Sequence, residues 1–363
     1  MPKLVMSPVT SAVLESPSAG VAAVTVRVCD DTDELAWERF VVNSAQASFF
    51  HRYGWRRVIT RAFGHRAHYL IAERGGTICG VLPLFHVRSL LFGKALISVP
   101  FCVYGGVASA DPEAVTHLID RAMQLAGDLS VDYLELRNET PQNPCWPTKD
   151  LYVTFKKEIS SVDEENLSAV PRKQRAMIRK GIKAGLDCHV DDDIDVLYDM
   201  YSQSVRNLGT PVFSKRYLEL LKAEFGDDCE VTIVSSDSRP VAGVMSFYFR
   251  DHVLPYYGGG TSEARVLCAN DFLYWQVMCQ AAQRSVRVFD YGRSKVDTGS
   301  YRFKKHWGFS PEPLYYEYGL VRATAMPNLS PTNPKYRLFI NLWKRMPLPL
   351  SRLIGPFISR NLG

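Results

Sequence analysis

The densest cluster of polar and aromatic side chains lies late in the chain, in two neighbouring runs. The first run is Phe289-Asp290-Tyr291-Gly292-Arg293, and the second is Tyr301-Arg302-Phe303-Lys304-Lys305-His306-Trp307-Gly308-Phe309. Asp290 ends an apolar stretch, and a charged group at the carboxyl end of a strand lies where open α/β sheets place ligands. In a short helix over 300–307, Arg302, Lys305 and His306 would share one side, while Phe303 and Trp307 share another. This arrangement suits a ligand site, and also a basic exposed turn with an aromatic anchor.

The spacing of apolar residues predicts the elements that position this cluster. Residues 229–235 and 241–249 form the two strands of a hairpin, and residues 253–257 form a strand that runs into Gly258-Gly259-Gly260. An apolar helix over 270–284, rich in aromatic residues, leads to a strand over 286–291. The cluster is therefore expected at the end of that strand and on the short helix that follows it.

The first part of the chain repeats this order of elements. Helices are expected over 33–45 and 53–62, a hairpin over 67–73 and 77–87, a strand over 95–107, a helix over 112–126 and a strand over 131–137. Three short matches support the repeat: Cys79-Gly80-Val81 with Ala242-Gly243-Val244, Tyr104-Gly105-Gly106 with Tyr257-Gly258-Gly259, and Tyr133-Leu134-Glu135 with Val288-Phe289-Asp290. A repeat of about 155 residues predicts a duplicated domain, the alternative being coincidence among common turn residues. Because the first copy has Glu135 in place of Asp290 and no partner for 304–307, we expect it to be structural.

Two further segments are strongly basic. A helical segment over 163–184 has six basic residues and no acidic residue between Pro171 and Leu186, which suits phosphates of RNA, a cofactor or lipid headgroups, or a solvated surface. The segment 333–363 mixes basic residues with Leu, Ile, Trp and Phe and contains no Asp or Glu. That pattern is typical of a helix on an anionic membrane surface, and also of a helix packed on the body or of a dimer contact.

The overall composition excludes several classes of protein. The 363 residues are 46% hydrophobic and 22% charged, with a net charge of +5, which excludes a disordered, collagen-like or coiled-coil chain. The eight cysteines form no C-x-x-C pair and are expected as free thiols in a reducing cytoplasm. No apolar run is long enough to span a membrane, and residues 1–22 are expected as a mobile tail rather than a signal peptide. The sequence has no G-x-S-x-G, P-loop or H-E-x-x-H motif, and no metal site is expected.

The late motifs resemble those of a known family. The run Leu254-Pro255-Tyr256-Tyr257-Gly258-Gly259, the strand end Phe289-Asp290-Tyr291-Gly292 and the helix from Tyr301 to Phe309 are together similar to the FemAB-like branch of the GNAT acyltransferase superfamily. In that pattern a strand leads to a turn of small residues, and a D-F/Y-G strand end precedes a short helix with the sequence F-K-x-x-W/F-G. The run Pro171-Arg172-Lys173-Gln174-Arg175 looks like the basic element ahead of the family's second domain. The tail from Asn333 to Leu338 is similar to that of FemAB-type proteins found with exosortase/PEP-CTERM systems of exopolysaccharide-producing bacteria.

This resemblance, which covers roughly residues 24–360, implies a fold and a division of the chain. The implied fold class is α/β (α+β), with two tandem GNAT-like domains that each contain a mixed, mostly antiparallel sheet flanked by helices. The expected parts are a mobile tail over 1–22, an N-terminal domain over 23–160, an active C-terminal domain over 161–322 and a basic amphipathic tail over 323–363.

The activity that the resemblance implies is transfer of an acyl or aminoacyl group to an amine, without a covalent enzyme intermediate. Asp290 is the expected base for the amine, Tyr301 is an acid or an orienting hydroxyl, and Lys304 matches the lysine that the family places near an acceptor phosphate or the developing oxyanion. Backbone N–H groups beside Tyr257 and Gly258 are expected to hold the carbonyl oxygen. The other residues expected to bind donor or acceptor are Arg265, Arg293, Lys305 and Trp307.

The resemblance leaves two donors open. Family members that use acyl-CoA carry an R/Q-x-x-G-x-G/A phosphate loop, whose glycines are missing from residues 261–268. The donor is therefore acyl-CoA or aminoacyl-tRNA, with tRNA as a candidate partner and no tightly bound cofactor. The acceptor is expected to be a small-molecule or lipid-linked precursor of the cell envelope or of an exopolysaccharide, modified in the cytoplasm or at the inner membrane surface. The alternative is a catalytically inactive GNAT-fold protein that docks on an anionic membrane through its tail.

Overall fold

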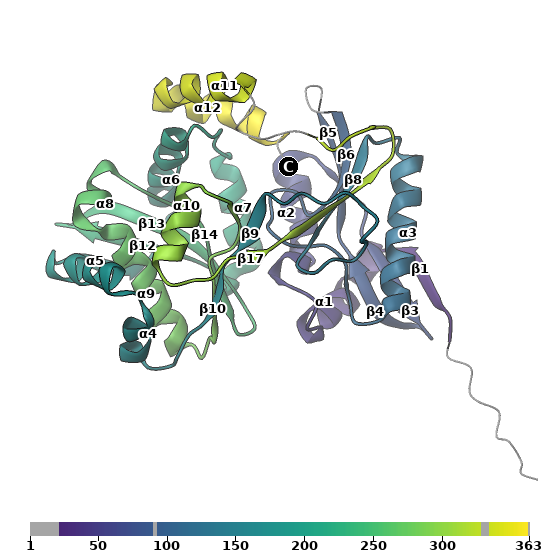
Figure 1. The fold of residues 1–363 in the computed structure, drawn as a ribbon, viewed down its shortest axis with the longest axis horizontal. Coiled ribbons are helices and arrows are strands. Elements are labelled where there is room, and N and C mark those ends of the chain that lie inside the picture. The colour runs from purple at the N-terminus through teal and green to yellow at the C-terminus, as the bar shows by residue number, and fades with distance from the viewer. Residues whose placement is uncertain (1–21, 90–92, 328–333, 362–363) are drawn as a thin grey trace, which may run out of the picture.

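The chain folds into two halves that lie side by side, with a pair of helices at one end (Figure 1). The structure is a computed structural model that describes residues 22–89, 93–327 and 334–361, so the tail expected over 1–22 lies outside the described residues except for Ala22. The elements up to residue 154 are β1 (Val24–Val28), α1 (Glu34–Asn43), α2 (Gly54–Phe63), β2 (Arg66–Ala67), β3 (Leu70–Arg74), β4 (Thr77–Leu82), β5 (Leu84–Ser89), β6 (Gly93–Ser98), β7 (Ala108–Ser109), α3 (Pro112–Asp128), β8 (Tyr133–Asn138) and β9 (Tyr152–Thr154).

The second half has the larger sheet and more helices. Its elements are β10 (Lys156–Glu158), α4 (Asp163–Ala169), α5 (Arg172–Lys183), β11 (Asp187–Val190), α6 (Ile194–Leu208), α7 (Lys215–Phe225), β12 (Cys229–Ser236), β13 (Arg239–Phe249), β14 (His252–Gly260), α8 (Ser262–Leu267), α9 (Ala269–Gln283), β15 (Val288–Asp290), β16 (Ser294–Lys295), α10 (Gly299–His306), β17 (Glu312–Pro313), β18 (Tyr315–Leu320), α11 (Pro334–Arg345) and α12 (Leu348–Ser359).

Each half contains mixed β-sheet with a single parallel pair among its described strands. The second half has one six-stranded sheet in the order β10-β15-β14-β13-β12-β11, in which β14 and β15 are parallel. The first half divides its strands between the sheets β1-β3-β4-β7 and β18-β8-β6-β5-β2, in which β6 and β8 are parallel. The first and third sequence matches of the repeat lie on equivalent strands, whereas Tyr104-Gly105-Gly106 lies in a loop and Tyr257-Gly258-Gly259 lies in β14.

Strand pairing crosses the division that the sequence suggested at residue 160. β18 follows every other strand in the chain, yet it pairs antiparallel with β8 over six residue pairs and completes a sheet of the first half. In the other direction, β10 lies before residue 160 but pairs with β15, which lies after it. β9 and β10 are two separate strands although only Phe155 lies between them, because β9 joins β16 and β17 in a separate small sheet. The domain boundaries at 160 and 322 stay a prediction.

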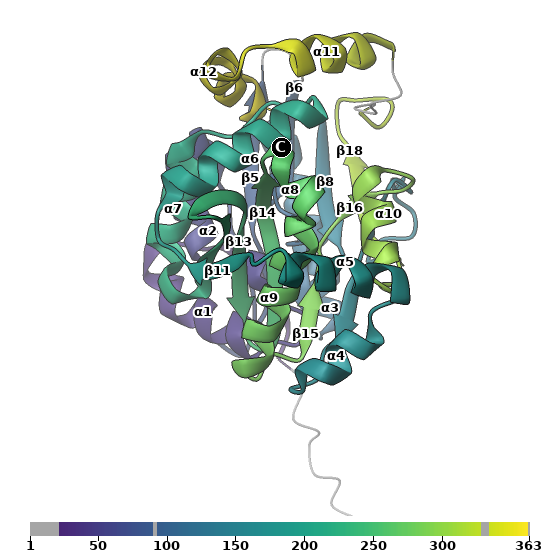
Figure 2. The ribbon, with the colours of Figure 1, turned by 90° about the vertical axis from the view of Figure 1, so that its left-hand side faces the viewer.

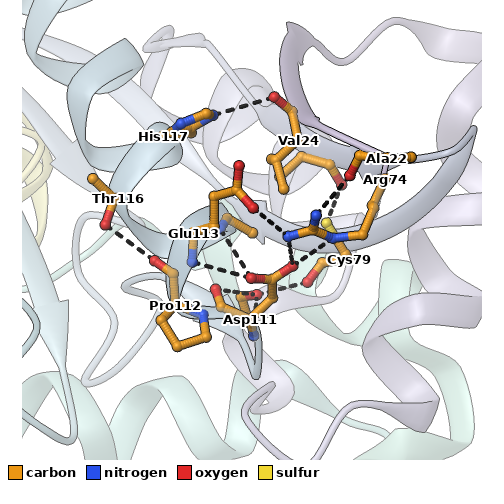
Figure 3. Close-up of polar contacts among 12 residues, drawn as sticks. Ala22, Val24, Arg74, Cys79, Asp111, Pro112, Glu113, Thr116 and His117 are labelled. Carbon is orange, nitrogen blue, oxygen red and sulfur yellow. Dashed lines mark hydrogen bonds and ion pairs between the residues drawn. The ribbon is translucent and has the colours of Figure 1, made fainter. Parts of the chain in front are cut away.

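Local chemistry explains where several elements begin and end. α3 begins at Pro112, where a missing N–H costs nothing, and the Asp111 side chain accepts hydrogen bonds from Glu113 N and Ala114 N at 3.0 and 3.4 Å. Arg74 of β3 joins Asp111 and Glu113 with N–O distances of 2.7 and 2.6 Å, which fixes the helix on the sheet (Figure 3). The basic helix expected over 163–184 is divided into α4 and α5, since Pro171 cannot continue a helix and holds Val170 in an extended conformation.

The two halves share one hydrophobic core. The ring of Phe49, from the first half, stacks on Phe247 of β13 with centroids 4.6 Å apart, and Trp55 of α2 packs against Phe225 of α7. These rings belong to a continuous cluster of buried residues that includes members of both halves. The interface is therefore a fixed surface on which a site can be built.

The C-terminal segment ends in two helices, α11 and α12, that pack on α6 (Figure 2). No helix within the described ranges is both long enough and apolar enough to cross a membrane.

Candidate functional site

An opening forms where the two parallel strands of the second half diverge. β14 and β15 pair at only two positions, His252 with Val288 and Val253 with Phe289, and then separate. On its other edge β14 stays paired with β13, but the register shifts between Met245 and Ser246, so that Tyr256 is an extra residue. A bulge of this kind bends the strand and increases its local twist.

A cavity of about 580 Å³ lies at this opening, between the two halves. Its volume is within the range of small-molecule binding sites. The lining comes from the loop after β6, from α6 and the loop after it, from β14 and α9, from the segment after β15, from α10, and from the end of α12. The lining residues are Phe101, Val103, Tyr201, Val205, Leu208, Thr210, Pro211, Phe213, Pro255, Tyr256, Tyr257, Gly258, Tyr274, Tyr291, Gly292, Arg293, Ser300, Phe303, Lys304 and Ser359.

Lys304 is the buried amine of this cavity. Its Nζ donates hydrogen bonds to the carbonyl oxygens of Gly292 and Arg293 at 2.9 and 3.1 Å. Burial lowers the pKa of the amine to about 7, with Asp290 opposing and Arg293 adding to the effect. Near neutral pH the amine therefore exists in both protonation states, which suits a group that accepts and returns a proton.

Arg293 supplies a permanent positive charge to the same cavity. Its Nη1 donates a hydrogen bond to the hydroxyl of Tyr316 at 2.9 Å, and its guanidinium lies 4.5 Å from the ring centroid of Tyr152. These two aromatic residues belong to β18 and β9. A guanidinium that is held in this way is suited to phosphate or to a developing oxyanion, because its donors have a fixed geometry.

Asp290 faces a different cleft. Because side chains alternate along a strand, Phe289 and Tyr291 pack in the aromatic core of the second half, and Asp290 points to the other side. There its carboxylate accepts hydrogen bonds from Tyr104 Oη, at 3.2 and 3.1 Å to the two oxygens, and from Gly292 N at 2.7 Å. The side chain lines a smaller cleft of about 180 Å³ with Glu139, Lys156, Arg250 and His252 among the other lining residues.

The structure brings together only part of the group that the sequence suggested. Tyr257, Gly258, Arg293 and Lys304 all line the cavity of about 580 Å³. Asp290, Tyr301, Lys305, Trp307 and Arg265 are not among its lining residues. Their expected roles stay predictions.

Those outlying side chains have evident structural partners or are exposed. Trp307 is fully buried, and its Nε1 donates a hydrogen bond to Asp271 Oδ1 at 3.0 Å. Tyr301 packs edge-on against Phe155, and the Nζ of the exposed Lys305 lies 5.6 Å from the centroid of the Tyr301 ring. Arg265 is exposed on α8.

Several lining residues were not singled out from the sequence. Tyr256, Tyr274, Tyr291 and Phe303 form aromatic walls, and the Tyr291 hydroxyl is buried with no hydrogen-bond partner among the described residues. Strand alternation could have identified Tyr291, because it follows Asp290 and must face the opposite side. Phe101 has a φ of +71°, which no sequence pattern indicated.

The glycines at the end of β14 are explained by close packing against neighbouring helices. A side chain at Gly259 would lie 2.5 Å from the carbonyl oxygen of Met200, and one at Gly260 would lie 2.9 Å from Ala264, so these glycines allow α6 and α8 to pack closely. The first turn of α9 carries Asp271, a carboxyl group at the place where a phosphate would need N–H donors.

A known protein family matches the part of the chain that contributes most of the residues lining this cavity. Residues 172–305 match the family described as an acetyltransferase (GNAT) domain. The match runs from α5 to α10 and includes Tyr257, Gly258, Arg293 and Lys304. No curated protein sequence matches the chain.

Solved structures match nearly the whole chain in fold. The crystal structure of FemX has a TM-score of 0.65 at 13% identity, covering 87% of this chain and all of the FemX chain. The C-terminal domain (DUF2156) of a putative lysylphosphatidylglycerol synthetase from Agrobacterium fabrum has a TM-score of 0.54 at 12% identity, covering 79% of this chain and 91% of the other. A tandem GNAT protein from the clavulanic acid biosynthesis pathway has a TM-score of 0.50 at 12% identity, covering 81% and 97%. At these identities the likeness concerns the fold alone, and it confirms the predicted class of tandem GNAT-like units with helix-flanked sheets.

Proposed function

We propose that this chain is an acyltransferase that moves an acyl or aminoacyl group onto an amine in the cavity between β14 and β15. The observation that carries the proposal is the cavity itself. It lies at the divergence of the parallel strands within the matched GNAT domain, and it holds a buried amine with a pKa of about 7 beside a fixed guanidinium.

The reaction requires a proton acceptor and a group that stabilises negative charge. As the acceptor nitrogen attacks the acyl carbon, a C–N bond forms, the carbonyl oxygen becomes negative, and the bond to the donor's sulfur or oxygen then breaks. We assign proton uptake from the amine to neutral Lys304, which later returns the proton to the leaving group. Arg293 and backbone N–H groups near Tyr257 and Gly258 are the proposed partners of the oxyanion or of a substrate phosphate.

This assignment moves the role of base from Asp290 to Lys304. Asp290 lines the other cleft, whereas Lys304 lines the proposed reaction cavity. Lys304 has two of its N–H groups directed at carbonyl oxygens, which leaves its lone pair for the acceptor when the amine is neutral.

The walls of the cavity suit an acceptor that is partly apolar. Rings from Phe101, Phe213, Tyr256, Tyr274 and Phe303 supply flat apolar surfaces, as sugar rings and acyl chains require. We propose a small-molecule or lipid-linked precursor of the cell envelope, including those of exopolysaccharides, as the acceptor class. The donor class is acyl-CoA or aminoacyl-tRNA.

Two neighbouring lysines provide a test with a matched control. Lys304 is buried in the cavity, whereas Lys305 is exposed outside it. We expect purified protein to show a rise of several degrees in thermal midpoint with the correct donor at about 100 times its dissociation constant, equivalent to about 2.7 kcal/mol. We then expect Lys304→Met to lower single-turnover transfer with that donor by about 100-fold or more, and Lys305→Met to retain it.

Two outcomes would contradict the proposal. One is the absence of both stabilisation and transfer with acetyl-CoA, other acyl-CoA esters and charged tRNA. The other is full transfer by a folded Lys304→Met variant, which would place the chemistry elsewhere.

A further inference from the structure

The last helix, α12, has an inverted distribution of side chains. Ser351, Gly355 and Ser359 follow one another at intervals of four residues and are buried against the body. The opposite side of the helix presents Leu353 and Phe357, each 67% exposed, together with Leu350. A helix that only covers the body would bury its large apolar side chains and expose its serines, so the outer face of α12 is built for contact with something apolar.

The contacts of the inner face fix this orientation. Arg352 pairs with Asp199 at 2.8 Å and donates to Ser202 Oγ at 2.8 Å, both on α6. A side chain at Gly355 would lie 2.9 Å from the carbonyl oxygen of Val212, so only glycine allows this approach. At the end of the helix, Arg360 Nη2 donates to Phe63 O at 3.0 Å, which joins the tail to the first half. These contacts therefore prevent α12 from rotating about its axis to bury its leucine side chains.

The segment that carries these exposed apolar residues is basic. Residues 323–363 contain no Asp or Glu, and Lys344, Arg345 and Arg360 are exposed at the ends of α11 and α12. Leu342 of α11 is also exposed. We call this set the tail surface: Leu342, Leu350, Leu353 and Phe357 with Lys344, Arg345 and Arg360.

We propose that the tail surface docks on an anionic lipid bilayer, with α12 lying in the plane of the interface. Leucine and phenylalanine side chains enter the boundary between headgroups and acyl chains, while the basic residues remain at the level of the phosphates. Charge argues against a second copy of this chain as the occupant. A twofold contact through the same face would bring its basic residues together without acidic partners from this segment.

The position of the tail gives the docked molecule a definite orientation. α11 and α12 lie together at one end of the molecule in both views (Figures 1 and 2). Ser359, in the last turn of α12, also lines the cavity of about 580 Å³. Docking would hold that cavity next to the bilayer, where a lipid-linked substrate can reach it. The docking itself does not depend on the proposed acyl transfer.

Vesicle co-sedimentation of the full chain tests this proposal without any donor or acceptor. The vesicles are phosphatidylcholine alone or phosphatidylcholine with phosphatidylglycerol, and the variant is Leu353→Glu with Phe357→Glu. The matched control is Leu35→Glu on α1, because Leu35 is 80% exposed and lies outside the tail surface. Both sites are exposed, so circular dichroism should show folded protein in each case.

We expect the wild-type protein to bind the anionic vesicles and to bind neutral vesicles about 100-fold more weakly, since three basic residues each contribute about fivefold. The double variant should bind anionic vesicles at least about tenfold more weakly, and Leu35→Glu should bind like wild type. The proposal is overturned if the wild-type protein does not bind anionic vesicles, or if the double variant binds them as tightly as wild type does. It is also overturned if light scattering shows a dimer that the double variant converts to a monomer. A negative result in the vesicle assay would not change the expected result of the transfer assay, so each proposal can be rejected independently of the other.

Discussion

Replacing Lys304 with methionine should change how the stability of the protein depends on pH. Burial lowers the pKa of this amine to about 7 from the ordinary value of 10.5. Between these two pH values the unfolded chain binds a proton that the folded chain does not, so stability rises with pH across the window. Below pH 7 both states are protonated, and the folded state carries the full penalty of a buried charge. The lowered pKa of the Lys304 amine therefore reduces the free energy of unfolding at low pH. This reduction disappears as the pH approaches 10.5.

The size of the effect follows from the shift. For this group alone, burial of the charge should cost about 5 kcal/mol at pH 6 and about 2 kcal/mol at pH 9, so the free energy of unfolding should increase by about 3 kcal/mol between these pH values. Methionine has a similar length without the titrating amine, but it loses the two hydrogen bonds to backbone carbonyls, worth about 1 kcal/mol each. We therefore expect Lys304→Met to be about 2–3 kcal/mol more stable than wild type at pH 6 and about equally stable at pH 9.

Urea unfolding followed by far-UV circular dichroism at pH 6, 7, 8 and 9 measures this difference. Lys305→Met serves as the control, because it removes a neighbouring lysine that is exposed and lies outside the cavity. In a transfer assay, the wild-type rate should rise through an apparent pKa near 7 and then level off. Parallel stability curves for wild type and Lys304→Met would refute the argument that this amine is buried and neutral.

Two further predictions concern packing and buried polarity. Gly259→Ala should lower the free energy of unfolding by about 1–3 kcal/mol, because the new Cβ would lie 2.5 Å from a backbone carbonyl oxygen of α6. Gly127→Ala is the control: its Cβ would meet nothing within 4 Å, and in helix α3 the change should raise stability by up to about 1 kcal/mol. Thermal and urea unfolding of both variants decide this, and equal effects would contradict it. Tyr104→Phe removes a hydroxyl that donates to the buried Asp290 and should cost about 1–3 kcal/mol in urea unfolding, and an unchanged midpoint would mean that this hydrogen bond contributes nothing.

Local patterns predicted most of the individual elements. The hairpin of β12 and β13, helix α9 and the short helix α10 all lie within a few residues of their expected ranges, because their periodicity and turn residues are encoded in adjacent sequence. The break at Pro171 could also have been predicted, since a proline in the middle of a helical segment removes a hydrogen bond and restricts the preceding residue.

Long-range pairing could not be predicted in this way. β18 completes a sheet whose other strands all end at or before Asn138, and its own sequence gives no indication of which strand it joins. The cavity depends on the same kind of contact, because Phe101 comes from the first half and Ser359 from the tail. Sequence motifs therefore singled out Lys304 and Arg293 as candidates, whereas only the tertiary structure shows that both line a cavity between the halves.

Gly292 connects the two side chains that the sequence placed at the centre of the site. Its N–H donates to Asp290 Oδ1 at 2.7 Å, and its carbonyl oxygen accepts a hydrogen bond from Lys304 Nζ at 2.9 Å. Gly292 can direct its N–H towards Asp290 and its carbonyl oxygen towards Lys304 because it has a φ of +63°, a conformation that favours glycine. Asp290 thus lies outside the cavity but fixes the turn whose carbonyl holds the Lys304 amine inside it. The spacing Asp-Tyr-Gly followed by lysine on the next helix then has a physical reason: the carboxylate positions the turn, the glycine permits it, and the lysine occupies the cavity.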